Sequence, residues 1–317
     1  METPKTLMEA IKTFSDPTVA HEYIVSLRWP NGVQCPHCLK ATGEIHGRVS
    51  FLSTRRIWKC KECKKQFSVK SGTIMEDSPL GLDKWLTALW LLVSAKNGIS
   101  SYELARSLGI KQQSAWFLLH RLRHMLETGS MEKMTGTIEV DETFVGGKSK
   151  NMHTDRRAEQ RAKGFPKITV LGMRQREGEV RTMVVSNREQ ATLQGQIEEN
   201  VEEGATVYTD SWKSYNGLAN KFNHGIIDHN VGQYVSGDIS TNGMENYWTI
   251  LKRAYHGTYV HISDWHADKY LAEEDFRFNS RKQKDGERFA EAVSKMAGKR
   301  LTYAELTESH LVNLAPK

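Results

Sequence analysis

The chain has 317 residues, with 44 Lys and Arg against 38 Asp and Glu, which gives a formal net charge of +6. Its composition, 38% hydrophobic and 26% charged, is that of a globular protein and excludes wholesale disorder and fibrous architectures. The longest strongly apolar run, residues 85–93, is too short to cross a bilayer. The first 14 residues resemble a short amphipathic helix more than a signal peptide. We therefore expect a cytoplasmic protein with no membrane partner.

The net charge is confined to the first quarter of the chain. Residues 1–75 carry 12 Lys and Arg and six Asp and Glu, whereas the rest of the chain carries 32 of each. A length of this size predicts about two domains, or three if one is small. We predict an N-terminal helix and ribbon over 1–75, a helical segment over 76–134, an α/β domain over 135–282 and a tail over 283–317.

All four cysteines lie in that basic quarter, with the spacing C-x2-C-x21-C-x2-C. Cys35, Cys38, Cys60 and Cys63 match a four-thiolate zinc site, and the segments 47–52, 56–60 and 65–69 alternate as short β-strands. The pattern predicts a zinc ribbon whose Zn²⁺ is structural, because four thiolates leave no open coordination position. His37 should then be a bystander. Two disulfides or four unrelated thiols are the alternatives, and a cytosolic location disfavours disulfides.

The ribbon is also rich in basic residues. Residues 35–70 contain nine Lys and Arg and two acids, and Arg55, Arg56 and Lys59 are interleaved with Trp58 and Phe67. We expect these aromatic rings to be exposed, and basic side chains around exposed rings suit a nucleic-acid backbone. A solvated basic face on a protein-binding ribbon is the alternative.

Residues 76–134 change to a helical period, with an apolar stripe from Leu82 to Val93. A capping box at 100–103 opens a short helix, Gly109 ends it, and Lys111 begins a longer one. Two helices around a tight turn predict a helix-turn-helix, although a plain helical bundle between two domains fits too. If the segment is a helix-turn-helix, the side chains that face base edges would be those of Lys111, Gln112 and Gln113. The side chains that approach phosphates would be those of Arg121 and Arg123.

Residues 135–282 follow the order of an RNase H-like mixed sheet. A strand at 136–147 and a hairpin at 167–185 are followed by a helix, a strand ending at Asp210, short helical and strand segments, and two helices starting near 241 and 265. In that fold an acid on the first strand, Asp141, lies beside the acid that ends the fourth, Asp210. Glu245 on the following helix supplies the third.

Three carboxylates on rigid elements are suited to binding two Mg²⁺ or Mn²⁺ ions. Lys252 shares a helix face with Glu245 and would hold a DNA strand near the metals. Alternatives remain open at several positions. Glu139 shares a strand face with Asp141, and Asp210 could cap a helix. The rivals of Glu245 are Asp228, Asp238 and Asn246.

The chain resembles the zinc-ribbon-bearing bacterial insertion-sequence transposases of the DDE type. The resemblance covers residues 18–282 and lies in the cysteine pairs, the helical pair and four stretches: VDETFVGGK at 140–148, YTDSWKSY at 208–215, NGMENYWTILKR at 242–253 and GTYVH at 257–261. It implies an RNase H-like catalytic domain, magnesium dependence, and cut-and-join chemistry on terminal inverted repeats. It assigns Asp141 and Asp210 as metal ligands, and Glu245 with Lys252 as the matching Glu-x6-Lys pair.

The loop from 148 to 167 contains seven Lys and Arg and two acids. Lys148, Arg156 and Arg157 are expected to grip DNA, with a solvent-exposed disordered loop as the alternative. The tail could add a helix for packing or for oligomerisation.

The resulting expectation is a nucleoid-associated DNA transposase that works as a dimer or a larger assembly on double-stranded element ends and target DNA. A catalytically silent DNA-binding regulator and an RNase H-like nuclease without joining activity are the alternatives.

Overall fold

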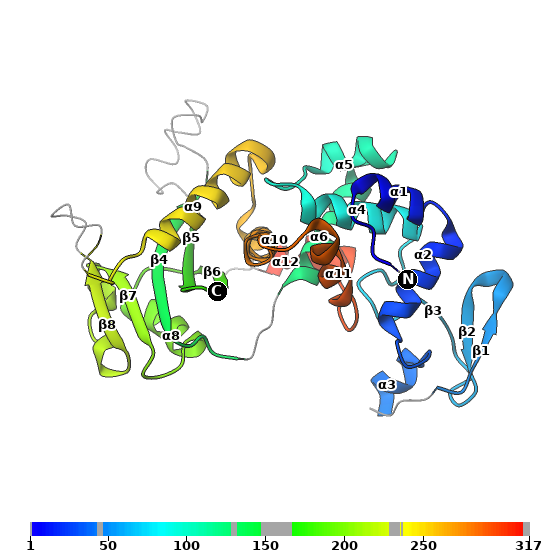
Figure 1. The fold of residues 1–317 in the computed structure, drawn as a ribbon, viewed down its shortest axis with the longest axis horizontal. Helices are drawn as coiled ribbons and strands as arrows, with labels where there is room; N and C mark the ends of the chain where they lie inside the picture. The colour runs from blue at the N-terminus through cyan, green and yellow to red at the C-terminus, as the bar shows by residue number, and fades with distance from the viewer. Residues whose placement is uncertain are drawn as a thin grey trace. The chain divides into compact units, whose positions relative to one another are not determined.

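The computed structural model describes residues 2–42, 47–127, 132–146, 167–227, 235 and 237–312. They form two compact units, which Figure 1 shows. The first combines Met1–Leu126 with Lys282–Lys317, and the second is Glu127–Arg281. The C-terminal segment is thus part of the N-terminal unit.

The first unit consists of a small antiparallel sheet, in the order β1-β2-β3, and a set of helices. Its elements are α1 Leu7–Phe14, α2 Pro17–Arg28, α3 Pro36–Thr42, β1 Val49–Leu52, η1 Ser53–Arg55, β2 Ile57–Cys60, β3 Gln66–Ser68, α4 Leu82–Ser94, α5 Ser101–Leu108, α6 Gln112–Leu126, α11 Asp285–Ser294 and α12 Tyr303–Val312. The three predicted ribbon strands are all present.

Aromatic side chains form the interior of the ribbon. Trp58 on β2 stacks on His21 of α2, with ring centroids 5.2 Å apart. The same indole meets the Trp29 ring edge-on and stacks on the Phe67 ring. Trp58 and Phe67 are 5% and 2% exposed, so our expectation that these rings lie on the surface is wrong. A module this small has little other apolar area to bury, so its largest rings turn inward. Phe51 is half exposed instead.

The helical pair has the local structure that its sequence predicts. The Ser100 hydroxyl accepts the backbone N–H of Glu103 at 3.2 Å and caps α5. Gly109 ends α5 with a φ of +61°, a left-handed conformation that glycine adopts without steric cost. The longer helix α6 follows directly.

Helix α11, from the C-terminal segment, completes the core of the first unit. Phe289 is fully buried, with its ring 5.6 Å from Phe14 and 5.1 Å from Trp90, measured between centroids. The next helix, α12, places Tyr303 edge-on against Phe117 of α6. The tail therefore packs against helices that precede it by 186 to 275 residues.

The second unit is built on a five-stranded mixed sheet in the order β6-β5-β4-β7-β8. The first three strands in sequence are antiparallel neighbours, whereas β7 and β8 are added in parallel beside β4. This arrangement confirms the predicted RNase H-like fold class. Its elements are β4 Thr137–Val145, β5 Ile168–Gln175, β6 Val180–Val185, α8 Gln190–Asn200, β7 Thr206–Asp210, η3 Lys213–Tyr215, η4 Leu218–Asn220, β8 Asn223–Ile227, α9 Asn242–Ala254, η6 Tyr255–Tyr259, η7 Asp264–His266 and α10 Ala267–Asn279.

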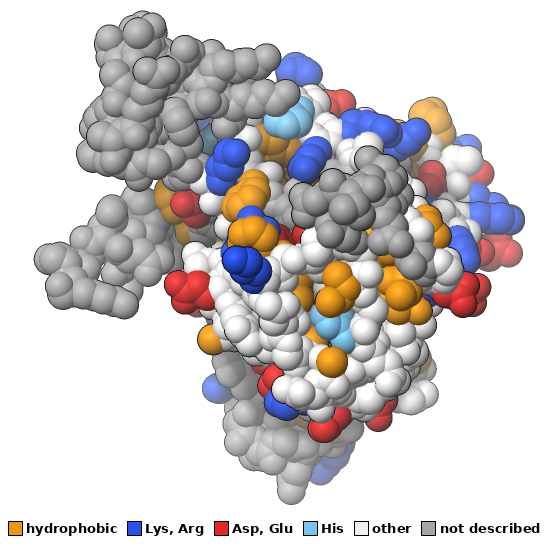
Figure 2. All heavy atoms as spheres, turned by 90° about the vertical axis from the view of Figure 1, so that its left-hand side faces the viewer, with side chains coloured by type: hydrophobic (Ala, Val, Ile, Leu, Met, Phe, Trp, Pro, Cys, Tyr) orange, Lys and Arg blue, Asp and Glu red, His pale blue; other side chains and the backbone are white. Residues whose placement is uncertain are grey.

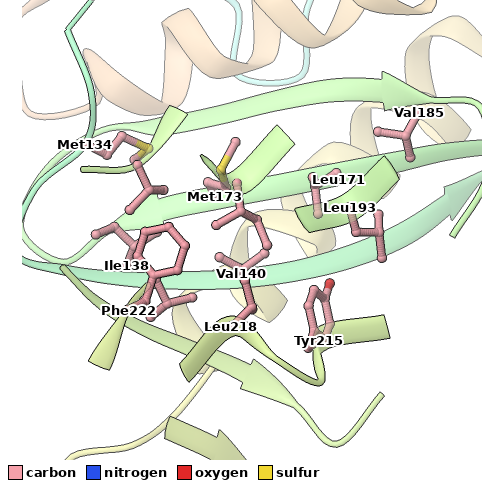
Figure 3. Close-up of a cluster of buried hydrophobic side chains, with 13 residues drawn as sticks. Met134, Ile138, Val140, Leu171, Met173, Val185, Leu193, Tyr215, Leu218 and Phe222 are labelled. Atoms are coloured by element: carbon pink, nitrogen blue, oxygen red, sulfur yellow. The ribbon is translucent and has the colours of Figure 1, made fainter. Parts of the chain in front are cut away.

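Each face of this sheet is covered by its own apolar cluster, because successive side chains of a strand point to opposite faces. Ile138 and Val140 of β4 pack with Leu193 of α8 and with Tyr215 and Leu218, as Figure 3 shows. Val145 and Val170 belong to the opposite cluster, with residues of α9 and α10. In Figure 1 α9 crosses over β4 and β5.

Gly172 allows α9 to lie close to the sheet. A Cβ at this position would come within 2.3 Å of the Met244 Cε and 2.6 Å of the Trp248 ring. Gly172 is the partner of Asp141 in the β4–β5 register. The missing side chain therefore opens space for Trp248 directly beside the candidate catalytic acid.

Candidate functional site

The four cysteines converge as a metal site requires. The Sγ atoms of Cys35 and Cys63 are 3.7 Å apart, those of Cys38 and Cys60 are 3.8 Å apart, and all four lie within 4.8 Å of one another. A tetrahedron with Zn–S bonds of about 2.3 Å has S···S edges of about 3.8 Å, so the donors fit Zn²⁺. A disulfide needs sulfurs about 2.05 Å apart, which excludes that alternative here.

His37 is outside this set. Its Nε2 lies 3.2 Å from the carbonyl oxygen of Gln66, on strand β3. The imidazole thus has a backbone partner in the ribbon, as expected of a bystander.

The basic residues predicted on the ribbon are on its surface. Arg55, Arg56 and Lys59 are exposed, and Arg56 donates a 2.9 Å hydrogen bond to the Thr18 hydroxyl. With Trp58 and Phe67 buried, Phe51 is the exposed aromatic ring on the same hairpin. The ribbon therefore presents its cations without the interleaved aromatic surface that we had expected.

The residues of the predicted helix-turn-helix divide into exposed and buried groups. Lys111 and Gln113 are exposed and Gln112 is partly buried; the amide groups of Gln112 and Gln113 donate to Ser101 and Tyr303 at 2.8 and 2.9 Å. Arg121 and Arg123 are only 4% and 1% exposed.

The burial of these two arginines corrects our expectation that they approach phosphates. The Arg121 guanidinium donates to the carbonyl oxygen of Glu76 and lies 5.1 Å from the centroid of the Trp85 ring. Most of α6 is buried, so both arginines are buried with it, and their aliphatic stems can pack among the apolar side chains. They belong to the interior of the first unit.

Asp141 and Asp210 occupy matching positions on adjacent strands. In the parallel β4–β7 pair Thr137 is opposite Thr206 and Glu139 is opposite Tyr208, so the same register places Asp141 opposite Asp210. Strand β7 ends at Asp210, whereas β4 continues to Val145. Both acids lie two residues beyond the last paired position, Glu139–Tyr208, and the Asp210 carboxylate is near enough to raise the pKa of Asp141.

Asp141 is held by the helix that covers its face of the sheet. The Trp248 indole N–H donates to Oδ2 at 2.9 Å, and the backbone N–H of Glu142 donates to Oδ1 at 2.8 Å. The pKa of Asp141 is raised to about 7, because burial and the neighbouring carboxylates of Glu142 and Asp210 outweigh the hydrogen bond from Trp248. Since two of these causes are neighbouring negative charges, a cation bound among the carboxylates would lower the pKa of Asp141 again.

Asp210 also accepts a local hydrogen bond. Its Oδ1 receives the backbone N–H of Trp212 at 3.0 Å, a turn that fixes the carboxylate at the end of the strand. This bond closes a turn and is not a helix cap, because the 3-10 helix that follows has Trp212 at its N-cap position and no side-chain capping bond.

Glu139 shares the face of Asp141, as period two predicts, but it is committed to other partners. Its carboxylate pairs with Arg174 and Arg176, at 3.4 and 3.1 Å, and accepts the backbone N–H of Met244 at 3.1 Å. The acid is 3% exposed and ties the start of α9 to the sheet. These bonds support the structural alternative for Glu139.

Sequence reasoning missed a second acid network on the opposite face. Glu142 accepts hydrogen bonds from Arg188 and, at 2.5 Å, from the Tyr215 hydroxyl. The pKa of Tyr215 is raised by burial and by the carboxylates of Glu142, Asp141 and Asp210. Arg188 follows β6 without any motif around it, so the sequence offers no signal for this pairing. Trp248, by contrast, lies four residues after the apolar Met244 on α9, and that spacing could have predicted that it faces the sheet.

The helix α9 carries the remaining candidates on its solvent side. Glu245, Asn246 and Lys252 are exposed, and so is Asp238 in the segment before the helix. Within the described residues the four cysteines alone form a group of three or more Cys, His, Asp or Glu ligand atoms within 4.8 Å. The structure thus brings Asp141 and Asp210 together, while Glu245 lies outside such a cluster.

Four expected residues lie outside the part of the chain that the structure describes: Lys148, Arg156, Arg157 and Asp228. Figure 2 views the second unit from its β8 side, where Lys and Arg are interspersed with Asp and Glu among the described residues. No described helix has the length and apolarity needed to cross a membrane.

Two protein-family models match this chain, one over the mixed-sheet unit and one over the zinc ribbon. Residues 133–279 match the ISXO2-like transposase domain, and residues 16–66 match the transposase zinc-ribbon domain. An uncharacterized transposase-like protein of Haemophilus influenzae is 35% identical over 102 residues, which cover 32% of this chain and 81% of that protein. An uncharacterized protein in transposable element ISH50 of Halobacterium salinarum is 26% identical over 257 residues, 78% of this chain and 85% of that protein. No solved structure matches the chain significantly.

Proposed function

The chain belongs to the zinc-ribbon-bearing insertion-sequence transposases of the DDE type, and we propose that it is a DNA transposase that cuts and joins DNA at the ends of its element. The observation that supports this most strongly is the position of Asp141 opposite Asp210 where the β4–β7 pair ends. Carboxylates on neighbouring strands of a rigid sheet can hold divalent ions with little rearrangement.

The proposed metal ligands are Asp141 and Asp210, with Glu245 or its neighbour Asn246 on α9 as the third. Oxygen donors of this kind suit Mg²⁺ or Mn²⁺. Two such ions, when bound, supply activation of the attacking hydroxyl and stabilisation of the leaving 3′ oxygen. The chain's own part is to orient both carboxylates, which the bonds from Trp248 and Trp212 support, and the bond from Trp248 also favours the ionised form of Asp141.

Capture of the DNA falls to other parts of the chain. Arg55, Arg56 and Lys59 of the ribbon would neutralise phosphates at the terminal inverted repeats, and Lys111 with Gln113 would face the groove at the start of α6. Lys252 would hold the strand near the metal ligands, together with the basic loop that contains Lys148, Arg156 and Arg157. Since two element ends must be joined to one target, a dimer or larger assembly on double-stranded DNA is proposed.

A strand-transfer assay tests the proposal. The protein is incubated with a duplex that carries the element end and with a target plasmid, in Mg²⁺ or in EDTA. We expect 3′-hydroxyl ends and joined products in Mg²⁺ alone, and a loss of at least about 1,000-fold for Asp141→Asn and Asp210→Asn. The exposed Asp264→Asn, in the same unit, is the matched control and should keep near wild-type activity.

The same products separate the alternatives. Hydrolysis without joining would indicate a nuclease, and DNA binding without cleavage would indicate a silent regulator. Unchanged activity in both Asp141→Asn and Asp210→Asn would contradict the proposed site. Comparing Glu245→Gln with Asn246→Ala identifies the third ligand, because only the ligand's variant should lose activity.

A further inference from the structure

An exposed valine occupies a strained turn at the end of helix α9. Val260 follows the π-helical turn Tyr255–Tyr259 and has a φ of +62° and a ψ of −44°. The backbone N–H of His261 donates to the carbonyl oxygen of Tyr259 at 2.6 Å, so Val260 is the central residue of a γ-turn of the rare, strained kind. A β-branched residue adopts such a conformation only at a cost. The Val260 side chain is 69% exposed, so its own packing does not offset that cost.

The turn is held in place by buried residues on both sides. Tyr255 before it and Ile262 after it belong to the apolar cluster that joins α9 and α10 to the sheet. The Tyr259 hydroxyl donates a hydrogen bond to the buried Glu273 carboxylate of α10. A strained residue persists where its surroundings fix the backbone in this way. The fold therefore holds Val260 at the surface in a conformation that a relaxed loop would avoid.

The surface around the valine is positively charged. Residues 252–263 include Lys252, Arg253 and two histidines, and they contain no Asp or Glu. Both cations are exposed, and so are His256 and His261. Lysine and arginine neutralise DNA phosphates, and imidazole N–H groups can donate to them. The charge of this surface therefore fits a DNA duplex as the partner.

One face of α9 connects the turn to the proposed third metal ligand. Glu245 is exposed, and Lys252, Arg253 and His256 follow it by seven, eight and eleven residues, which places all four on the same side of the helix. At about 1.5 Å per residue, His256 lies about 17 Å along the helix from Glu245. A duplex rises about 3.4 Å per base pair. A duplex that follows this face from a scissile phosphate at Glu245 would thus reach the turn after about five base pairs.

We infer that Val260 is a wedge that enters a base-pair step of the element-end duplex, about five base pairs from the scissile phosphate. This rests on the proposed function, because the spacing is counted from Glu245 as a metal ligand. Apolar side chains that insert between base pairs unstack them and kink the duplex. Lys252 and Arg253 would hold the neighbouring phosphates. Because the turn is already fixed, little conformational entropy is lost when the wedge enters.

Fluorescence of 2-aminopurine tests the inference without catalysis. The full-length protein is bound in Ca²⁺ to element-end duplexes that carry 2-aminopurine at one position at a time on either side of the scissile phosphate. This base fluoresces more strongly when it is unstacked, so we expect a several-fold increase at one step, about five base pairs away. Val260→Gly should abolish the increase, and Val260→Leu, which keeps an apolar side chain, should retain it. Ile226→Ala, at another exposed aliphatic residue of the same unit, is the matched control and should leave it unchanged.

The strain gives Val260→Gly a second readout that separates the wedge from a folding defect. Glycine adopts a positive φ without steric cost, so this variant should unfold at a higher temperature than wild type. Its cleavage rate in Mg²⁺ should nevertheless fall about 10- to 100-fold, because the unstacking of one step is no longer supported. A valine with a purely structural role would not combine a gain of stability with a loss of cleavage.

Three results would overturn the inference. The first is a Val260→Gly protein with wild-type fluorescence and cleavage. The second is a fluorescence increase that Val260→Gly does not remove. The third is a change in the sedimentation of the DNA-free protein in Val260→Gly with the fluorescence increase intact, which would assign the turn to contacts between copies of the chain. If wild type unstacks the base but never cleaves or joins DNA, the proposed function fails and the wedge stands.

Discussion

At the scale of single residues, the behaviour of Asp141 depends on a balance of burial and hydrogen bonding. Burial, Glu142 and Asp210 raise its pKa to about 7, and the Trp248 indole opposes them. A carboxyl group must lose its proton before it binds a cation. The indole therefore contributes to metal binding although it is not itself a ligand.

The first prediction concerns this indole. Trp248→Phe keeps an aromatic ring but removes the N–H that lowers the pKa of Asp141, so that pKa should rise further. We expect cleavage at neutral pH to fall roughly tenfold, the scale of one hydrogen bond to a charged group, and the pH–rate profile to move to higher pH. Tyr247→Phe provides the control, because the Tyr247 hydroxyl bonds Asp275 and not Asp141. A profile that keeps its position on the pH axis would contradict the assignment.

At the scale of elements, α9 and α10 are fixed to the sheet by contacts that differ in kind. Helix α9 approaches through a gap in the side chains, at Gly172. Helix α10 is fixed by a buried acid: Asp275 accepts the backbone N–H of Thr182 on β6 at 2.9 Å and the Tyr247 hydroxyl at 2.5 Å. Burial raises the pKa of Asp275 to about 7.

The gap at Gly172 gives the second prediction. Gly172→Ala would force the Met244 methyl and the Trp248 ring to move, and the rigid indole cannot do so without shifting α9. We expect the second unit to lose about 1–3 kcal/mol of unfolding free energy in urea titrations, with a larger proportional loss of strand cleavage. Gly195→Ala on α8, where a Cβ meets open space, is the control and should be neutral or slightly stabilising. A fully active Gly172→Ala protein would argue against this packing.

The third prediction is a pH dependence with a definite sign. Between the ordinary value of 3.8 and about 7 the folded protein keeps the proton of Asp275 that the unfolded chain releases, so the unfolding free energy falls as pH rises. Asn does not ionise, so Asp275→Asn lacks this contribution. Urea titrations should show the wild type losing stability relative to Asp275→Asn from about pH 4 to pH 7. A difference that stays constant over that range would contradict the raised pKa.

The sequence predicted the elements better than their environments. Strand periodicity and the order of segments were enough for the mixed sheet and for the neighbouring positions of Asp141 and Asp210, because both follow from backbone pairing. Burial of Trp58, Phe67, Arg121 and Arg123 could not be predicted, since it depends on which other elements pack against each face. The pairing of Glu142 with Arg188 joins positions 46 residues apart for the same reason.

At the scale of the whole molecule, the two units divide the proposed tasks. The first unit contains the zinc ribbon, the helical pair and the C-terminal helices, and the second contains the paired acids. The net positive charge belongs to residues 1–75, within the unit to which we assign DNA capture. The C-terminal segment, whose role the sequence left open, supplies part of that unit's core.

The fourth prediction tests this role of the tail. Phe289→Ala removes a fully buried ring that contacts Phe14 and Trp90, and should cost about 3–5 kcal/mol of the first unit's unfolding free energy. Thermal unfolding should show a lower transition for that unit. Tyr303→Ala, at a ring that is 43% exposed, should cost much less. A wild-type transition in Phe289→Ala would show that the tail is dispensable for the unit's core.

The most direct test of the account is a change of metal specificity at the paired acids. Asp141→Cys and Asp210→Cys replace an oxygen ligand, which Mg²⁺ prefers, with a thiolate that binds softer ions better. Strand cleavage and joining should be lost in Mg²⁺ and partly restored in Mn²⁺, while Asp141→Ser stays inactive in both. Full Mg²⁺-dependent activity in Asp141→Cys would contradict the claim that this carboxylate binds the catalytic metal.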